Sequence, residues 1–293
     1  MDAGQAERIN KDASVLMKQG IALLEEGRPK AAADALEFFN RALQLRLELP
    51  RGVDPFHAYL LAACWLNRGD ALMQLAEPDK VPAAINSYDE GIAVMSGVSL
   101  HDDPRYLRRL GMGLQNRGIA LLASGGRVTE ALDSFEQSLD LLESDAASPL
   151  ADRDYLLAGV WANVAIARAA ESTPASDTLS RAAALRAIGL VAGFESDDRP
   201  SAEVGLKARY VLCQVIAGQL PMTAAKGAHM PEAVHEATDH AEAGLALAKH
   251  WESKGELRFW PLAHDLYRFA EAVYERYQPR FLEEFRTENA GFK

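Results

Sequence analysis

The sequence has few cysteines, and their positions do not let them act together. Cys64 and Cys213 are the only two among 293 residues, and neither belongs to a CxxC motif or a spacing typical of a metal site. The chain therefore has no disulfide framework, which is typical of proteins from a reducing compartment. We expect a cytoplasmic protein.

Long apolar runs and surplus positive charge are also missing. No stretch approaches the roughly 18 uninterrupted apolar residues of a membrane-spanning helix, and the N-terminal stretch MDAGQAERINKDAS lacks the apolar core of a signal peptide. The chain has 31 Lys and Arg residues and 42 Asp and Glu residues, which gives a net charge of −11. Because phosphates are bound by surplus cations, we expect no nucleic acid and no membrane among the partners. An acidic surface is better suited to a basic or neutral partner.

Signals for β-strands are absent too, since no alternating β-branched runs are bounded by Asn-Gly or Asp-Gly turns. Signals for helix starts recur instead. Asp54-Pro55 and Asp103-Pro104 each place a capping acid before a proline, and Arg199-Pro200 adds a third proline at such a position. With 48% apolar and 25% charged residues, the chain has a globular composition. The fold is therefore predicted to be all-α.

A block of seven residues recurs along the chain. Residues 18–24 (KQGIALL) return as 67–73 (NRGDALM) and 116–122 (NRGIALL), and more loosely as 163–169 (NVAIARA), in steps of 49, 49 and 47 residues. Downstream of the first three blocks, small, aromatic and small residues follow at offsets 0, 4 and 7, which is one face of a helix. These are Ala35, Phe39 and Ala42, then Ala84, Tyr88 and Gly91, then Ala131, Phe135 and Ser138. Each unit is predicted to be a helix pair in which a glycine allows close approach and an aromatic ring fills the gap.

These blocks resemble tetratricopeptide repeats over roughly residues 13–250. The period is near 48 rather than the usual 34 or so residues, and the family's leucine before the glycine is replaced by Gln19, Arg68, Arg117 or Val164. The resemblance implies one right-handed α-solenoid of stacked antiparallel helix pairs, a single domain over 1–293. Its repeats are expected at about 13–48, 55–97, 104–144, 152–193 and 200–250, with a capping helix and tail at about 252–293.

The resemblance further implies that the first helices of the pairs line a concave surface. Asn67, Asn116 and Asn163 hold one equivalent position, with Lys18 as the first repeat's counterpart. In the repeat arrays of O-linked N-acetylglucosamine transferases, asparagines at this position hold an extended peptide, because an amide both donates and accepts hydrogen bonds. The alternative is that each amide bonds a backbone carbonyl of the next repeat and fixes the stacking.

Arg68 and Arg117 follow two of these asparagines. Their guanidinium groups could clamp a partner's carboxylate, or they could form ion pairs with an acid on the adjacent second helix, such as Asp89 or Glu136. The residues expected to set the selectivity of the surface are Arg68, Arg117, Asp70 and Gln115.

Catalytic and metal-binding patterns are missing from the sequence. GxSxG, Walker-type GxxxxGK[ST], GxGxxG and a plausible Cys–His arrangement do not occur. His235 and Asp239 have a helical i, i+4 spacing, but Asp239 stands where an HExxH zinc site needs its second histidine, and no third ligand is evident. A solvated polar stripe explains them, so we expect no enzyme, no cofactor and no metal.

The C-terminal segment is rich in aromatic residues, with ten of the 22 in the last 43 positions. A capping helix from about Leu257 to Tyr277, ending near Gln278-Pro279, would cover the last repeat. Alternatively, Phe281, Phe285 and Phe292 dock on another chain, which makes a homodimer possible, or fold back into the groove.

Taken together, these features predict an adaptor or scaffold that binds a peptide or protein partner on the concave repeat surface. Two other classes stay open. One is a homo-oligomeric structural or assembly protein that uses the aromatic C-terminal segment. The other is an all-α enzyme or small-molecule sensor with a cleft in the solenoid.

Overall fold

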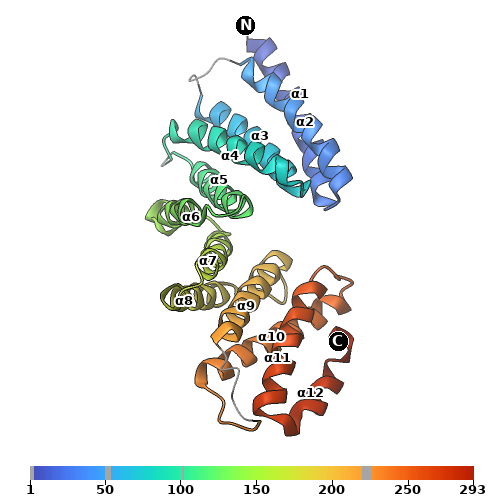
Figure 1. Ribbon diagram of the computed structural model, residues 1–293. Coiled ribbons are helices and arrows are strands. Elements are labelled where there is room, and N and C mark those ends of the chain that lie inside the picture. The colour runs from blue at the N-terminus through green and yellow to red at the C-terminus, as the bar shows by residue number, and fades with distance from the viewer. Residues whose placement is uncertain (1–2, 50–53, 101, 220–225) are drawn as a thin grey trace. The chain divides into compact units, whose positions relative to one another are not determined.

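The computed structural model describes residues 3–49, 54–100, 102–219 and 226–293, and all regular secondary structure in these ranges is helical. Those ranges contain no strand, so the all-α prediction is confirmed, and the helices pack in consecutive pairs as in an α-solenoid (Figure 1). The chain divides into two compact units, Met1–Arg153 (unit 1) and Asp154–Lys293 (unit 2). The single continuous domain stays a prediction.

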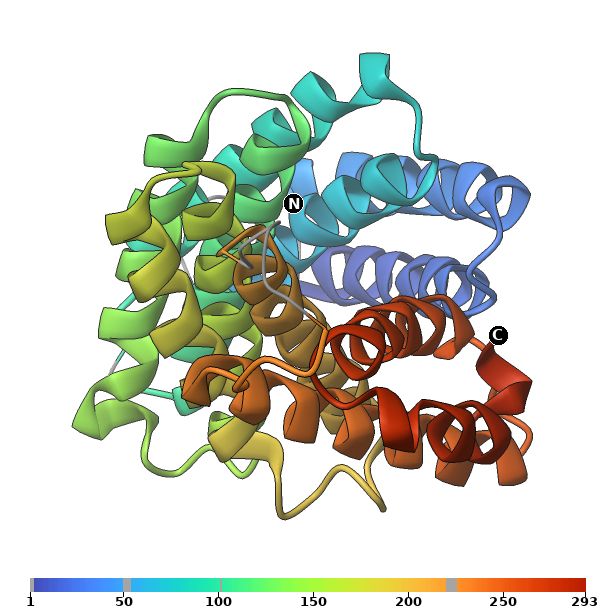
Figure 2. The same ribbon diagram turned by 60° about the horizontal axis from the view of Figure 1, so that its bottom comes forward.

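Unit 1 consists of three helix pairs. The first helices α1, α3 and α5 pack against their second helices α2, α4 and α6, and Figures 1 and 2 show α1 beside α2 and α3 beside α4. The second helices α2 and α4 also pack on the next first helices, α3 and α5, and α3 contacts both α1 and α5. The bounds are α1 (Ala3–Glu25), α2 (Pro29–Leu47), α3 (Pro55–Gln74), α4 (Val81–Ser96), α5 (Pro104–Ala123) and α6 (Val128–Glu143), with 3-10 turns η1 (Pro78–Lys80) and η2 (Asp145–Ala147).

The helix starts follow the capping signals in the sequence. Asp54 accepts a hydrogen bond from the Phe56 N–H at 2.9 Å, and Asp103 accepts one from the Arg105 N–H at 2.8 Å. Each cap precedes a proline in the first turn, where the missing N–H costs no hydrogen bond. These side chains fix where α3 and α5 begin.

The core of each pair is an aromatic ring set against a glycine. The rings of the second helices are buried, and they occupy the space that a Cβ on the first helix would need. Such a Cβ would lie 2.5 Å from Phe39 at Gly20, 2.5 Å from Tyr88 at Gly69 and 2.3 Å from Phe135 at Gly118. The predicted close approach at the glycines is therefore confirmed in all three pairs.

Unit 2 continues the chain with α7 and further helices that pack in order. The hydroxyl of Ser180 on α8 donates to the Ala165 carbonyl on α7 at 2.7 Å, α8 packs on α9, and α10 packs on both α9 and α11. The bounds are α7 (Arg153–Ala170), α8 (Pro174–Val191), α9 (Arg199–Gln219), α10 (Glu232–Ser253), α11 (Trp260–Tyr277) and α12 (Leu282–Glu288), with 3-10 turns η3 (Pro279–Phe281) and η4 (Ala290–Phe292).

Unit 2 contains a buried ion pair beside a glycine. Arg209 on α9 donates from both terminal nitrogens to the carboxylate of Glu195, and both side chains are buried. Gly205 makes room for this pair, because a Cβ there would overlap the Glu195 carboxylate. Trp251 Nε1 donates to the Glu195 carbonyl at 2.9 Å. Both oxygens of the Glu195 carboxylate thus pair with the buried guanidinium, which offsets its desolvation, while Arg209 Nε has no hydrogen-bond partner among the described residues.

The aromatic C-terminal segment folds onto its own unit. The ring of Phe285 stacks between Tyr267 and Tyr274, with centroids at 5.4 and 4.9 Å, and Phe292 packs on Trp260 at 5.3 Å. Phe285 and Phe292 are buried within the unit, so their apolar surface is already covered in the single chain, and docking of these two on another chain stays a prediction. Phe281 remains 40% exposed.

Candidate functional site

The first-helix face of unit 1 carries the candidate binding residues. We define it as Lys18, Ile21, Asn67, Asp70, Asn116 and Ile119, which stand two positions before and one after the glycine of each repeat. The two positions are three residues apart, so they lie on one side of each helix. Because α3 contacts α1 and α5, the face continues from one first helix to the next.

Asn116 and Asp70 join two repeats. The Asn116 Nδ2 donates to Asp70 Oδ1 at 2.9 Å, and the Tyr88 hydroxyl donates to the same oxygen at 2.8 Å. Burial raises the pKa of Asp70 from 3.8 to about 6, against the opposing effect of the two hydrogen bonds. The structure thus places Asn116 in a stacking contact, whose acceptor is a carboxylate of the preceding repeat rather than the backbone carbonyl considered above.

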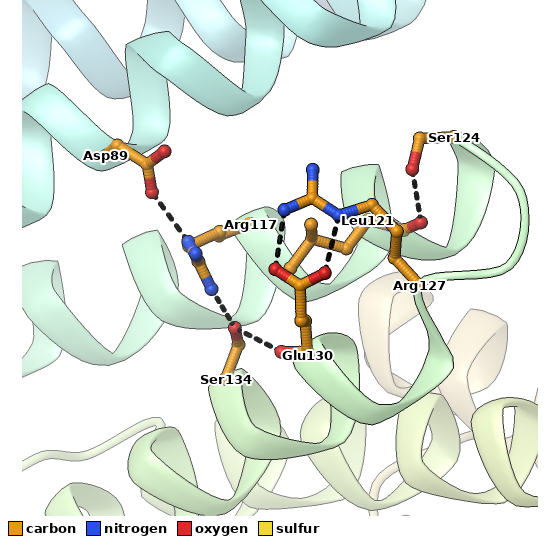
Figure 3. A network of polar contacts seen from close by, with 7 residues as sticks. All are labelled: Asp89, Arg117, Leu121, Ser124, Arg127, Glu130 and Ser134. Atoms are coloured by element: carbon orange, nitrogen blue, oxygen red, sulfur yellow. Dashed lines mark hydrogen bonds and ion pairs between the residues drawn. The ribbon is translucent and has the colours of Figure 1, made fainter.

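Arg68 and Arg117 make the same contact one repeat apart. Arg117 Nε donates to Asp89 Oδ1 at 2.6 Å and its Nη1 donates to the Ser134 hydroxyl at 2.6 Å, which ties α5 to α4 and α6 (Figure 3). Arg68 Nε donates to Asn40 Oδ1 at 2.9 Å, and its Nη1 donates to the Ser87 hydroxyl. Burial lowers the pKa of Arg68. Both guanidinium groups therefore hold neighbouring repeats together, and Arg117 forms the ion pair with Asp89 that the sequence left as an alternative.

Three of the predicted site residues in unit 1 have no such contact. Lys18 is exposed, Asn67 and Gln115 are partly buried, and none of them forms a hydrogen bond or ion pair with a residue that the structure describes. Asn163, which is in unit 2, is likewise partly buried and unpaired within the described ranges. Their polar groups are available to a ligand.

Sequence reasoning missed the isoleucines of this face. Ile21 and Ile119 are 40% and 37% exposed on α1 and α5, and Val15 on α1 is also exposed, at 50%. In unit 2, Ile166 holds the equivalent position on α7 and is also exposed. The repeated Gly-Ile-Ala of two blocks was the available signal, since a residue next to the packed glycine points to another side of the helix.

The acidic and histidine residues singled out in the sequence do not assemble into a centre. His235 Nε2 lies 3.9 Å from Asp239 Oδ2, and both side chains are exposed. Across the described ranges, no three His, Cys, Asp or Glu side chains lie close enough together to hold a metal ion. Among the same residues, we find no helix with the length and apolar character needed to span a bilayer.

We compared the chain with protein-family models, curated proteins and solved structures. No family model and no curated protein matches the chain. Among solved structures, the chain is similar to the one described as BtubC (BKLC) from P. vanneervenii, with a TM-score of 0.37 and 14% sequence identity over 100% of this chain and 94% of that one. A likeness of that degree indicates neither a family nor a function for this protein.

Proposed function

We propose that this protein is a non-enzymatic helical-repeat adaptor of the tetratricopeptide type, which binds a peptide or protein partner on the first-helix face of unit 1. The observation that carries the proposal is the exposure of Ile21 and Ile119 at one repeat position. Single exposed apolar residues are ordinary, but these two recur at one position in the first and third repeats, with Asp70 at that position between them. Lys18, Asn67 and Gln115 on the same three helices add polar groups that have no partner among the described residues.

The chemistry of the face indicates what it binds. The isoleucines suit apolar side chains of the partner, and the Asn67 amide can donate to and accept from an extended backbone. A net charge of −11 favours a neutral or basic segment. Both cysteines are free and buried, which suits the cytoplasmic location that forms part of this proposal.

A displayed library of random peptides, selected on the full chain, tests the proposal. Affinities of the selected peptides are then measured by fluorescence anisotropy for the wild type and the double variant Ile21→Ser/Ile119→Ser. Each isoleucine should contribute about 1 kcal/mol of apolar burial, so the double variant should bind at least about tenfold more weakly.

The matched control is Leu179→Ser/Phe194→Ser, which removes two exposed apolar side chains from unit 2. It should leave the affinity unchanged, and circular dichroism should show that both variants are folded. Equal affinity of the isoleucine variant and the wild type, or an equal loss in the control, would remove the support for this face.

A further inference from the structure

Arg46, in the last turn of α2, is a buried cation that has no counter-ion among the residues described by the structure. Its side chain is 4% exposed, and its hydrogen-bond acceptors are Asn10 Oδ1 at 2.8 Å from Nη1 and the Ser14 hydroxyl at 3.1 Å from Nη2. Its Nε has no partner. No carboxylate of the described residues forms an ion pair with it. All of its protein contacts are therefore neutral.

The neighbouring thiol does not supply the missing charge. Burial raises the pKa of Cys64 to about 11 in spite of the nearby guanidinium, so the thiol stays protonated at neutral pH. The contrast with unit 2 is direct, because the equally buried Arg209 donates to both oxygens of Glu195. A buried charge is expensive unless it is paired, and here the pairing group is missing.

Packing of the repeat does not require an arginine at this position. The equivalent residues of the second and third repeats are Met95 and Leu142, and both are buried in the same place on α4 and α6. Neither of those helices has a basic residue in its last turn, so the helix dipole needs no cation there either. The arginine is an exception to the repeat pattern.

A cavity of about 280 Å³ opens beside this guanidinium. Arg46 lines it together with the end of α2, the first half of α3 and the end of α4. Its walls are mainly apolar, and its polar members are His57, which shares Asn10 with Arg46, and the exposed Glu90. The apolar walls include Leu49, Leu61, Trp65, Val94 and Val98.

The corresponding hollow of the next repeat contains no cation. It is also about 280 Å³ and lies between α4, α5 and α6, with Ile92, Leu110 and Leu114 among its walls and Asp140 as its charged member. The combination of an apolar cavity with a buried, partly unpaired cation is therefore particular to the first of the two hollows.

We propose that the cavity of α2, α3 and α4 binds a carboxylate carried on a compact apolar group, with Arg46 as its counter-ion. The free Nε–H and the remaining Nη hydrogens can donate to the carboxylate oxygens, and the walls cover the apolar part. Asn10 and Ser14 hold the guanidinium in place. Glu90 disfavours a second negative charge, so the site selects a monocarboxylate.

Two sources can present this chemistry, a free aliphatic acid and the C-terminal residue of a peptide. Calorimetric titration of the full chain with octanoate and its neutral analogue octanol tests the carboxylate directly. A short peptide ending in leucine, as free acid and as amide, forms the second pair. In at least one pair, we expect the acid to bind roughly tenfold to a hundredfold more tightly than its neutral analogue. Whichever of the two acids, octanoate or the peptide, binds more tightly identifies the kind of molecule that carries the carboxylate.

Arg46→Met tests the role of the cation, because methionine is the residue of the next repeat at this position. It should fold and lose the preference for the acid. Arg41→Met, which removes an exposed arginine from the same helix, should keep that preference. Ala58→Leu fills the cavity while Arg46 stays, and should weaken binding of the acids at least tenfold.

The proposal is overturned if neither acid binds better than its neutral analogue, or if Arg46→Met keeps the preference. If Arg46→Met does not fold, unchanged acid binding by Ala58→Leu overturns the proposal instead. None of the residues of the first-helix face lines this cavity. Ile21→Ser/Ile119→Ser should therefore bind octanoate like the wild type, so this site and the adaptor function can fail separately.

Discussion

Replacing the glycine in the first helix of a repeat by alanine should destabilise the protein, which is the opposite of what Gly→Ala usually does inside a helix. Alanine is the better helix former by about 1 kcal/mol, so Gly→Ala inside a helix normally stabilises a protein. At Gly118, however, the added Cβ would lie 2.3 Å from the Phe135 Cε1 and 2.7 Å from its Cζ. The ring is completely buried and has no free space to move into.

We expect Gly118→Ala to destabilise the protein. Overpacking against a rigid side chain costs about 1–3 kcal/mol, and a contact this short belongs at the upper end. After subtraction of about 1 kcal/mol for helix propensity, the free energy of unfolding should fall by about 2 kcal/mol. Urea denaturation followed by circular dichroism measures the change.

The control is the same substitution at Gly189 in α8, where an added Cβ meets no atom within 4 Å. Gly189→Ala should raise the free energy of unfolding by about 0.5–1 kcal/mol. Replacing the ring as well, in Gly118→Ala/Phe135→Leu, should recover part of the loss relative to the sum of the single changes. If Gly118→Ala were as stabilising as Gly189→Ala, the packing of ring on glycine would not be what holds the repeat together.

Three further predictions concern the polar contacts and the C-terminal segment. The folded-state pKa of Asp70 is raised from 3.8 to about 6, so the folded protein holds this proton more tightly than the unfolded chain does. The free energy of unfolding of the wild type should therefore fall relative to that of Asp70→Asn as the pH rises from about 4 to 6. If urea denaturation gave the same difference between the two proteins at both pH values, the burial of the carboxylate would be contradicted. A double-mutant cycle on Arg117 and Asp89 should give a coupling free energy of about 0.2–1 kcal/mol, because Asp89 is half exposed to solvent. This coupling should decrease with added salt, and a coupling that does not depend on salt would count against an ion pair. Phe285→Ala should cost about 3 kcal/mol of stability and Phe281→Ala little, and sedimentation of both variants, compared with the wild type, will show whether either aromatic residue supports a dimer.

The local features of the fold were readable from the sequence because each depends on neighbours along the chain. The caps at Asp54 and Asp103 act on an N–H two residues away, and the glycine and ring positions follow helical periodicity. The capping helix expected from about Leu257 to Tyr277 appears as α11, Trp260–Tyr277, and Pro279 follows its end. The first helix begins earlier than the repeat pattern suggested, at Ala3 rather than near residue 13.

The partners of the candidate site residues were readable only in part. Asp89 was one of the acids considered for the arginines, but the Ser134 contact of Arg117 and the Asp70 contact of Asn116 were not expected. These pairings depend on how one repeat sits on the next, which a period near 48 residues does not specify.

Sequence alone thus determined the helical class, the repeat and the starts of α3 and α5, since these follow from backbone hydrogen bonding, capping and apolar periodicity within about 50 residues. Only the tertiary structure decided which polar groups are already paired. Within the ranges it describes, it gave Lys18, Asn67 and Gln115 no polar partner, buried Phe285 and Phe292, and placed Arg46 beside a mainly apolar cavity with no carboxylate paired to it. The physical reason is that burial and charge pairing are set by side chains from different helices, which meet only after the repeats have stacked.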